Sequence, residues 1–176
     1  MKKFMMSCAA VTMMLFAASC GNKGTNSEAA ADVAFETFNV EKYGVTIDVP
    51  QGMHRTDDPV MDNGALWSLV PADDPVDFAI YAAMDVSVYE SSYYDYTDEK
   101  IEEEFNSIPT EATSKQLDLE KKEYSYAIEG DIINEYHRVI FKDNLSATAI
   151  VSYTEKYADK MGGEVRDHIL NSLKFN

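Results

Sequence analysis

Three β-rich segments separated by two tight polar turns constrain the fold of this chain more than any other feature of its sequence. The segments span residues 123–129, 132–142 and 145–154, and the turns are Gly130-Asp131 and Asp143-Asn144. Strands joined by turns this short pair antiparallel with their chain neighbours, because a parallel pair needs a crossover of about a dozen residues or more. The sequence therefore predicts an antiparallel meander.

Further strands are predicted upstream of the meander. Residues Val45–Val49 alternate in polarity and stop at Pro50, as a strand does when a proline ends it. Asp62-Asn63-Gly64 predicts a hairpin, because Asn-Gly accepts the positive φ angles of a type I′ turn. The apolar run Phe78–Val86 predicts a longer strand that is covered on both faces.

Two helices are predicted around these strands. The first opens at Thr97, whose hydroxyl suits an N-cap, and it ends at Pro109. Its apolar stripe consists of Ile101, Phe105 and Ile108. The second begins at Glu155, and Gly162-Gly163 is a weak point inside it. Its apolar positions recur every four residues, which is a helical period: Tyr157, Met161, Val165, Ile169 and Leu173.

The two ends of this arrangement carry short motifs. The first reads YGVTIDVPQG over residues 43–52, and the second reads ILNSLKF over residues 169–175. Together with the order of elements, these motifs resemble the opening and closing motifs of the PsbP-like α/β/α sandwich family. Gly44 relieves the turn before the first strand, and Phe175 is expected to continue the chain onto the sheet.

The resemblance implies an α+β fold for residues 35–176, with an antiparallel β-sheet flanked by helices on both faces. It does not imply one activity, because a fold does not determine a function. Known members of the family are mostly accessory, binding or assembly proteins, among them a photosystem subunit and a GTPase-binding protein. The resemblance therefore favours a binding protein over an enzyme without naming a partner.

The first 19 residues are typical of a secretory signal. Lys2 and Lys3 precede an uncharged apolar run, Phe4–Phe16, and small residues follow it. That run is too short for a stable helix across a bilayer of ~30 Å, which needs roughly 20 residues. We therefore expect residues 1–19 to be removed.

The segment Ala17–Gly21 resembles the lipobox of bacterial lipoproteins, although Ala17 stands where leucine is usual. The resemblance implies that Cys20 carries a diacylglyceryl thioether and becomes the first residue of the mature chain. The alternative is ordinary signal peptidase cleavage, because Ala17-x-Ser19 also fits an A-x-A site. Cys8 is lost with the signal, so the mature chain has no free thiol for catalysis or for metal binding and no disulfide.

Residues 20–34 predict a lipidated flexible tether. The stretch from Gly21 to Ala34 has no apolar period, and about 14 residues of flexible coil reach roughly 20 Å. In some bacteria an aspartate directly after the lipidated cysteine marks retention in the inner membrane. This chain has Gly21 at that position instead of an aspartate. We therefore expect the chain in the outer membrane, on its periplasmic face.

The charge of the chain excludes one class of partner. Its net charge is −16, and loss of Lys2 and Lys3 leaves 13 basic against 31 acidic residues, or −18. A chain this acidic does not bind nucleic acid by neutralising phosphates, and anionic headgroups repel it, so the lipid on Cys20 must hold it to the membrane. Acidity also favours a monomer.

Two patterns are candidate sites, each with a structural alternative. Asp73, Asp74 and Asp77 could supply oxygen ligands to a weak calcium site, or they are ordinary solvated turn residues. A tyrosine-rich loop is either a recognition loop or a cover that packs over the following helix. Its tyrosines are Tyr89, Tyr93, Tyr94 and Tyr96.

No catalytic constellation is present in the sequence. It has no G-x-S-x-G nucleophile motif and no phosphate-binding loop. His54, His137 and His168 lack a ligand partner at metal spacing, so we predict no metal, no cofactor and no enzyme. The preferred function is a membrane-tethered accessory or binding lipoprotein for an envelope protein or a small ligand. The alternative is a hydrolase with a non-standard site, which would bring a histidine, a carboxylate and a hydroxyl together in one deep pocket.

Overall fold

The computed structural model describes residues 33–56, 62–69 and 82–176 of the chain. The strands in these ranges are β1 (Phe35–Val40), β2 (Val45–Pro50), β3 (His54–Arg55), β4 (Gly64–Ser68), β5 (Ala82–Glu90), β6 (Thr113–Asp118), β7 (Glu123–Glu129), β8 (Asn134–Lys142), β9 (Leu145–Tyr153) and β10 (Lys174–Phe175). The α-helices are α1 (Asp98–Ser107), α2 (Ala158–Met161) and α3 (Gly163–Ser172), and short 3₁₀ turns cover Glu41–Tyr43 and Glu155–Tyr157.

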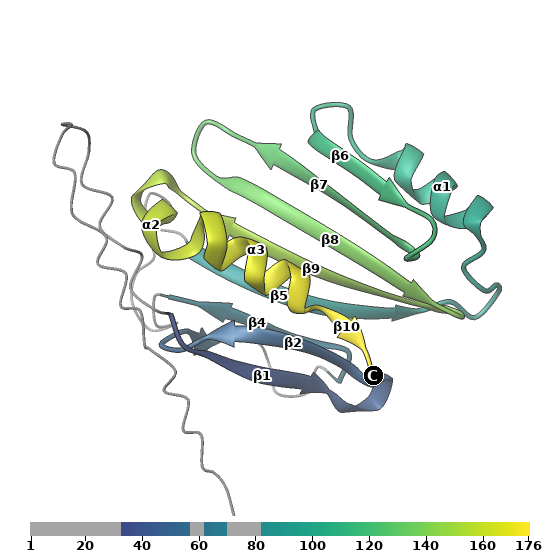
Figure 1. Ribbon diagram of the computed structural model, residues 1–176, viewed down its shortest axis with the longest axis horizontal. Coiled ribbons are helices and arrows are strands. Elements are labelled where there is room, and N and C mark those ends of the chain that lie inside the picture. The colour runs from purple at the N-terminus through teal and green to yellow at the C-terminus, as the bar shows by residue number, and fades with distance from the viewer. Residues whose placement is uncertain (1–32, 57–61, 70–81) are drawn as a thin grey trace, which may run out of the picture.

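The larger sheet has the strand order β3-β4-β5-β9-β8-β7-β6, and each neighbouring pair in it is antiparallel (Figure 1). The predicted meander is confirmed, since β7, β8 and β9 are consecutive neighbours. Its second turn follows the prediction, and Asp143 adopts a φ of 54° there. Its first turn is longer than predicted. The Gly130 amide donates to the Ile133 carbonyl, and β8 begins only at Asn134.

A smaller sheet of order β1-β2-β10 brings the C-terminal residues of the chain onto β2. Gly44 has a φ of +62°, which suits glycine, and this conformation lets the chain turn into β2 as predicted. Phe175 pairs with Val45, so the closing motif lies beside the opening motif. The two segments that carry the sequence resemblance are therefore neighbours in space.

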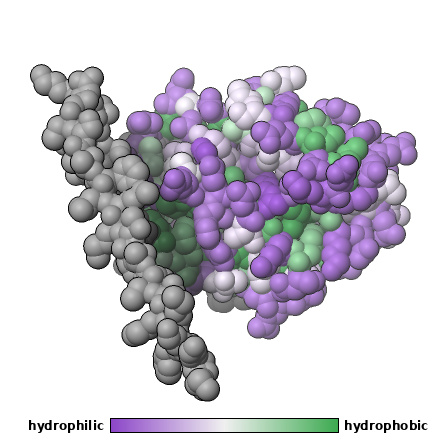
Figure 2. Space-filling view, in the orientation of Figure 1, coloured by the Kyte–Doolittle hydropathy of each residue, from purple (hydrophilic) through white to green (hydrophobic). Residues whose placement is uncertain are grey.

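The main core lies on one face of the larger sheet. Val45 and Ile47 of β2, Ile169 and Leu173 of α3, and Val151 of β9 are buried in it. Helix α3 packs between the smaller sheet and strands β8 and β9 (Figure 1). Polar side chains cover most of the surface on the side shown in Figure 2.

A second, smaller core joins α1 to the larger sheet. Ile101 of α1 is buried with Tyr124 of β7 and with Val139 and Phe141 of β8. Val139 and Phe141 alternate along β8 with Ile140, which belongs to the main core, so the two cores lie on opposite faces of this strand. The α+β class and the antiparallel sheet are confirmed. The second core that contains α1 also includes Leu117 of β6.

The C-terminal helical segment is interrupted where its glycines predicted a weak point. Gly162 separates α2 from α3 in an extended conformation, and Gly163, the first residue of α3, has a φ of +53°. Met161 of α2, Val165 and Ile169 of α3, and Leu173 directly after α3 are buried, as the period predicts. The N-cap of α1 is also confirmed, since the Thr97 hydroxyl accepts a hydrogen bond from the Lys100 amide at 3.4 Å.

The structure corrects the Asn63-Gly64 hairpin. Strand β3 ends at Arg55 and Gly64 already begins β4, so the connection is longer than a tight turn. Neither Asn63 nor Gly64 has a positive φ. Gly64 serves close packing instead, because a Cβ on it would lie 2.3 Å from the Val86 carbonyl oxygen of β5.

Two strand boundaries also differ from the sequence interpretation. Strand β5 runs on to Glu90, so Tyr89 and Glu90 belong to a strand rather than to a loop. Strand β6 was not expected, because its side chains are mostly exposed and carry no apolar alternation. It lies at an edge of the sheet and contains an irregularity between Thr113 and Gln116, where Ser114 has a φ of 52°.

Several sequence predictions lie outside the described residues. These are the signal segment 1–19, Cys20 with most of its tether, the start of the strand predicted at Phe78, and the candidate calcium ligands Asp73, Asp74 and Asp77. The helices within the described ranges are too short or too polar to cross a bilayer.

Candidate functional site

The tyrosine-rich loop is held in one conformation by hydrogen bonds to the turn between β8 and β9. The Ser91 amide bonds to the Asn144 carbonyl at 2.8 Å, and the Asn144 side-chain amide donates to the Ser91 carbonyl at 3.0 Å. The Tyr96 amide donates to the Asp143 carbonyl at 2.6 Å. Within the loop, the Ser91 hydroxyl accepts from the amides of Tyr93 and Tyr94, each at 3.3 Å. The loop is therefore an ordered extension of the sheet.

Three of the four tyrosines face solvent. Tyr93 is 91% exposed, Tyr89 59% and Tyr94 41%, and we call these three residues the tyrosine surface. A single exposed ring is ordinary, but exposed rings that gather at one end of a strand and in the loop after it are candidates for contact with a partner. Tyr96 is 6% exposed, so the structure removes it from the candidate recognition residues.

Tyr96 instead connects the loop to the second core. Its ring packs edge-on against Tyr94 with centroids 5.5 Å apart, and it contacts Phe141 at 4.7 Å. Its hydroxyl lies 3.5 Å from the Ser146 hydroxyl, and burial raises the pKa of Tyr96 to about 12. The aromatic contacts continue from Phe141 to Tyr124. The exposed rings therefore stand on a packed aromatic base.

Acidic side chains surround the tyrosine surface. Glu90 and Asp95 adjoin it in the chain, and Asp143 lies in the turn to which the loop is bonded. All three are exposed, and none of them forms an ion pair within the described part of the chain. Lys100, the base nearest to the loop in sequence, is already paired with Glu103.

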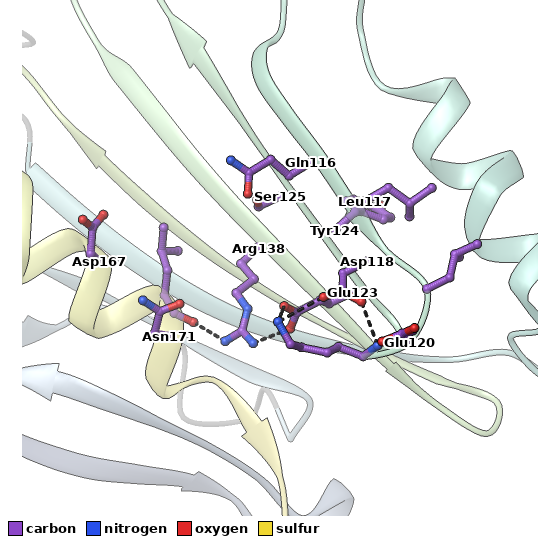
Figure 3. A pocket seen from close by; sticks show the side chains of 13 residues that line it. Gln116, Leu117, Asp118, Glu120, Glu123, Tyr124, Ser125, Arg138, Asp167 and Asn171 are labelled. Atoms are coloured by element: carbon purple, nitrogen blue, oxygen red, sulfur yellow. Dashed lines mark hydrogen bonds and ion pairs between the residues drawn. The ribbon is translucent and has the colours of Figure 1, made fainter.

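A groove of about 910 Å³ lies between α3 and strands β6 to β8 (Figure 3). Arg138 crosses it and donates to the carbonyls of Leu170 at 2.7 Å and Leu173 at 3.1 Å, and it also pairs with Glu123. These bonds attach the C-terminal end of α3 to the sheet. Lys121 pairs with Asp118 at 3.0 Å, so the basic groups of the groove are used internally. We interpret the groove as a structural junction.

A polar cluster occupies the sheet face next to the α1 cover. Asp85 lies opposite Ile150 on β9, and Ile150 lies opposite His137 on β8. His137 contacts Glu135 at 3.2 Å and stacks on the Tyr126 ring at 4.3 Å. Burial raises the pKa of Asp85 to about 6, and the charge of Glu135 adds to the effect. Burial lowers the pKa of His137, so its imidazole is neutral at neutral pH.

The remaining histidine contacts do not assemble a hydrolase site. His168 Nε2 lies 2.9 Å from Asp48 at the exposed edge of α3 and stacks on Phe35. A hydroxyl is near in sequence, but Ser172 donates to the Ile169 carbonyl and accepts from the Asp48 amide. The pKa of Asp48 is lowered by its hydrogen bonds from Thr37 and His168, against an opposing effect of burial. Within the described ranges, no group of three or more acidic, histidine or cysteine side chains is placed to hold a metal ion.

Two charged positions escaped the sequence interpretation. Arg138 was overlooked although it shares a face of β8 with Tyr136 and Ile140, which contact the main core. A charge on such a face indicates a specific partner. Asp85 carried the same signal inside an apolar run. The surroundings of neither residue were readable from the sequence, because Leu170, which Arg138 contacts, and Glu135, whose charge acts on Asp85, are distant in sequence.

No protein-family model matches the chain, and a search of the curated proteins gives no match either. Among solved structures the chain is similar to cyanobacterial PsbP (CyanoP) from Synechocystis sp. PCC 6803. The TM-score is 0.52 and the sequence identity 15%, and the match covers 90% of this chain and 98% of that one. The chain has a PsbP-like fold. This finding confirms the resemblance carried by the opening and closing motifs.

Two further structures are similar at lower scores. The Saccharomyces cerevisiae Ran-binding protein Mog1p has a TM-score of 0.47 and 10% identity, covering 81% of this chain and 96% of Mog1p. A protein from Bacteroides thetaiotaomicron VPI-5482 has a TM-score of 0.45 and 10% identity, covering 76% of this chain and 45% of that one. The assignment rests on the PsbP likeness, which at this identity shows the fold alone.

Proposed function

We propose that this chain is a non-enzymatic accessory module of the bacterial envelope that docks on another envelope protein through the tyrosine surface. The observation that carries the proposal is the 91% exposure of Tyr93 on a loop bonded to the β8–β9 turn. Tyrosine is enriched at protein interfaces because it combines a large apolar area with a polar tip. A loop that is already ordered loses less conformational entropy when a partner binds.

A lipid anchor belongs to the same proposal. The Ala17–Gly21 segment supports lipidation of Cys20, and the polar tether after it supports a domain that stands off the membrane. Two or more acyl chains on one residue give stable attachment, whereas a single chain gives only marginal binding. The proposed location is the periplasmic face of the outer membrane.

Site-specific photo-cross-linking in cells tests the docking surface. A photoreactive phenylalanine analogue is placed at Tyr93 or at Tyr89 in the full chain, and the matched control position is Ile132. Ile132 is 58% exposed and lies in the turn between β7 and β8, at the opposite end of β8 from the tyrosine-rich loop. We expect the same protein adduct from Tyr93 and Tyr89 and none from Ile132. Absence of an adduct at both tyrosines, or equal adducts at all three positions, would overturn the proposal.

The hydrolase alternative gains no support from the described histidines. His168 and Asp48 are paired at an exposed edge rather than in a deep pocket, and the Ser172 hydroxyl is bonded to backbone groups. His137 pairs with Glu135 and has no hydroxyl partner among its hydrogen bonds to the described residues. A nucleophile must lie within hydrogen-bond reach of its base, and neither cluster provides that geometry.

A further inference from the structure

We infer that the segment recognised by the tyrosine surface is basic, with arginine or lysine side chains that contact the tyrosine rings and the surrounding carboxylates together. This inference rests on the proposed docking function and adds the chemistry of the partner. Its basis is the placement of exposed aromatic rings and unpaired acids at the end of β5, on the ordered loop after it and on the turn between β8 and β9.

The first argument is charge. Glu90, Asp95 and Asp143 are exposed and unpaired within the described part of the chain. The neighbouring bases form no ion pair with them, because Lys100 pairs with Glu103, Lys122 pairs with Asp98, and Lys142 donates to the Asn176 carbonyl. An opposite charge on the partner would be attracted to these three carboxylates, whereas an acidic partner would be repelled.

The second argument is the chemistry of the rings. Aromatic faces attract cations, and the molecule itself uses this contact where Lys100 Nζ lies 5.5 Å from the centroid of the Tyr94 ring. The Tyr93 ring makes no comparable contact among the described residues. A guanidinium group can stack on such a ring while its N–H groups bond to a carboxylate. Arginine therefore suits this surface best.

The same charges disfavour other occupants. A second copy of this chain carries the same net charge of −16, or −18 after loss of the signal segment, so two copies repel each other. An anionic lipid surface is repelled for the same reason. A neutral apolar partner would contact the rings but would leave the carboxylates without a counter-charge. A basic protein segment satisfies both features.

A defined peptide tests the inference without knowledge of the natural partner. The probe is a fluorescent peptide of about eight residues in which arginines alternate with glycine and serine, and its control carries neutral citrulline at the same positions. Fluorescence anisotropy with the full chain in a non-ionic detergent gives the affinity. We expect the arginine peptide to bind and the citrulline peptide to bind at least about tenfold more weakly.

Matched variants separate the local surface from the overall charge of the chain. One variant carries Glu90→Gln, Asp95→Asn and Asp143→Asn, and the control variant carries Glu120→Gln, Glu129→Gln and Asp131→Asn. Both remove three exposed carboxylates and change the net charge equally. Three surface ion pairs together correspond to about tenfold in affinity, so the first variant should bind the arginine peptide about tenfold more weakly. The control variant should stay within about twofold of the unsubstituted chain.

The rings are tested by a further variant with Tyr93→Ser and Tyr94→Ser, which should weaken arginine-peptide binding by about two- to fivefold. Equal losses in the two acid variants, or no loss from either, would overturn the inference. Its failure is distinct from failure of the docking proposal. If cross-linking at Tyr93 yields a partner and the peptide does not discriminate between the acid variants, the docking function stands and only the basic character of the partner is rejected.

Discussion

Replacement of Asp85 by asparagine should stabilise the protein at neutral pH. The Asp85 carboxyl lies on the sheet face near Glu135, and burial raises its pKa from 3.8 to about 6. Because the folded state holds this proton more tightly than the unfolded state, the ionised carboxylate destabilises the fold as pH rises through this range. At about 1.4 kcal/mol for each pKa unit, the destabilisation at pH 7.5 is about 3 kcal/mol. The asparagine side chain would have no charge to desolvate.

The pH dependence distinguishes this cause from a change in packing. At pH 4 most of the Asp85 side chains in the folded protein are protonated, and the predicted difference between the two proteins falls to about 0.5 kcal/mol. Urea unfolding of Asp85→Asn and of the unsubstituted chain at pH 4 and pH 7.5 measures both values. The control is Asp131→Asn, which removes an exposed carboxylate in the turn between β7 and β8. A gain of the same size at both pH values, or no gain at pH 7.5, would refute the electrostatic reasoning.

Three further predictions follow from the anchor, the aromatic base and the close strand packing. Cys20→Ser should abolish lipidation and release the protein from the membrane fraction, and retention there after fractionation would contradict the lipobox interpretation. Tyr96→Ala should lower the free energy of unfolding by about 3–5 kcal/mol, because the Tyr96 ring is buried. Tyr93→Ala should lower it by about 0.5 kcal/mol or less, because the Tyr93 ring is exposed, and thermal unfolding of the two variants compares these values. Gly64→Ala should lower the free energy of unfolding by about 1–3 kcal/mol, because the new Cβ would collide with the Val86 backbone. An unchanged denaturation midpoint would show that β4 and β5 can move apart without cost and would contradict this prediction.

Local patterns predicted the elements that depend on neighbours in the chain. The N-cap at Thr97, the turn at Asp143 and the break at Gly162-Gly163 occur where the sequence placed them. Each depends on the conformational preference of one or two residues. The apolar period of the C-terminal helices was equally reliable, because burial of Met161 and Ile169 repeats at helical spacing.

The failures share a different physical origin. The Asn63-Gly64 pair had the composition of a tight turn, yet it leads into β4 because the close approach of β5 also requires a glycine. Strand β6 gave no apolar alternation, since most of its side chains are exposed at the edge of the sheet and only Leu117 among its apolar residues packs against the second core. In both cases contacts with distant residues decided a conformation that the local sequence left open.

The sequence by itself determined the acidic charge, the antiparallel meander and the helix period, and it supplied the prediction of a signal segment with a lipobox, because all of these depend on composition or on short-range spacing. Only the tertiary structure decided which tyrosine is buried and which is exposed. Tyr93 and Tyr96 lie three residues apart in one loop, and hydrogen bonds to the β8–β9 turn direct one ring into the second core and the other into solvent. That turn lies nearly fifty residues further along the chain, so no local pattern contained the outcome.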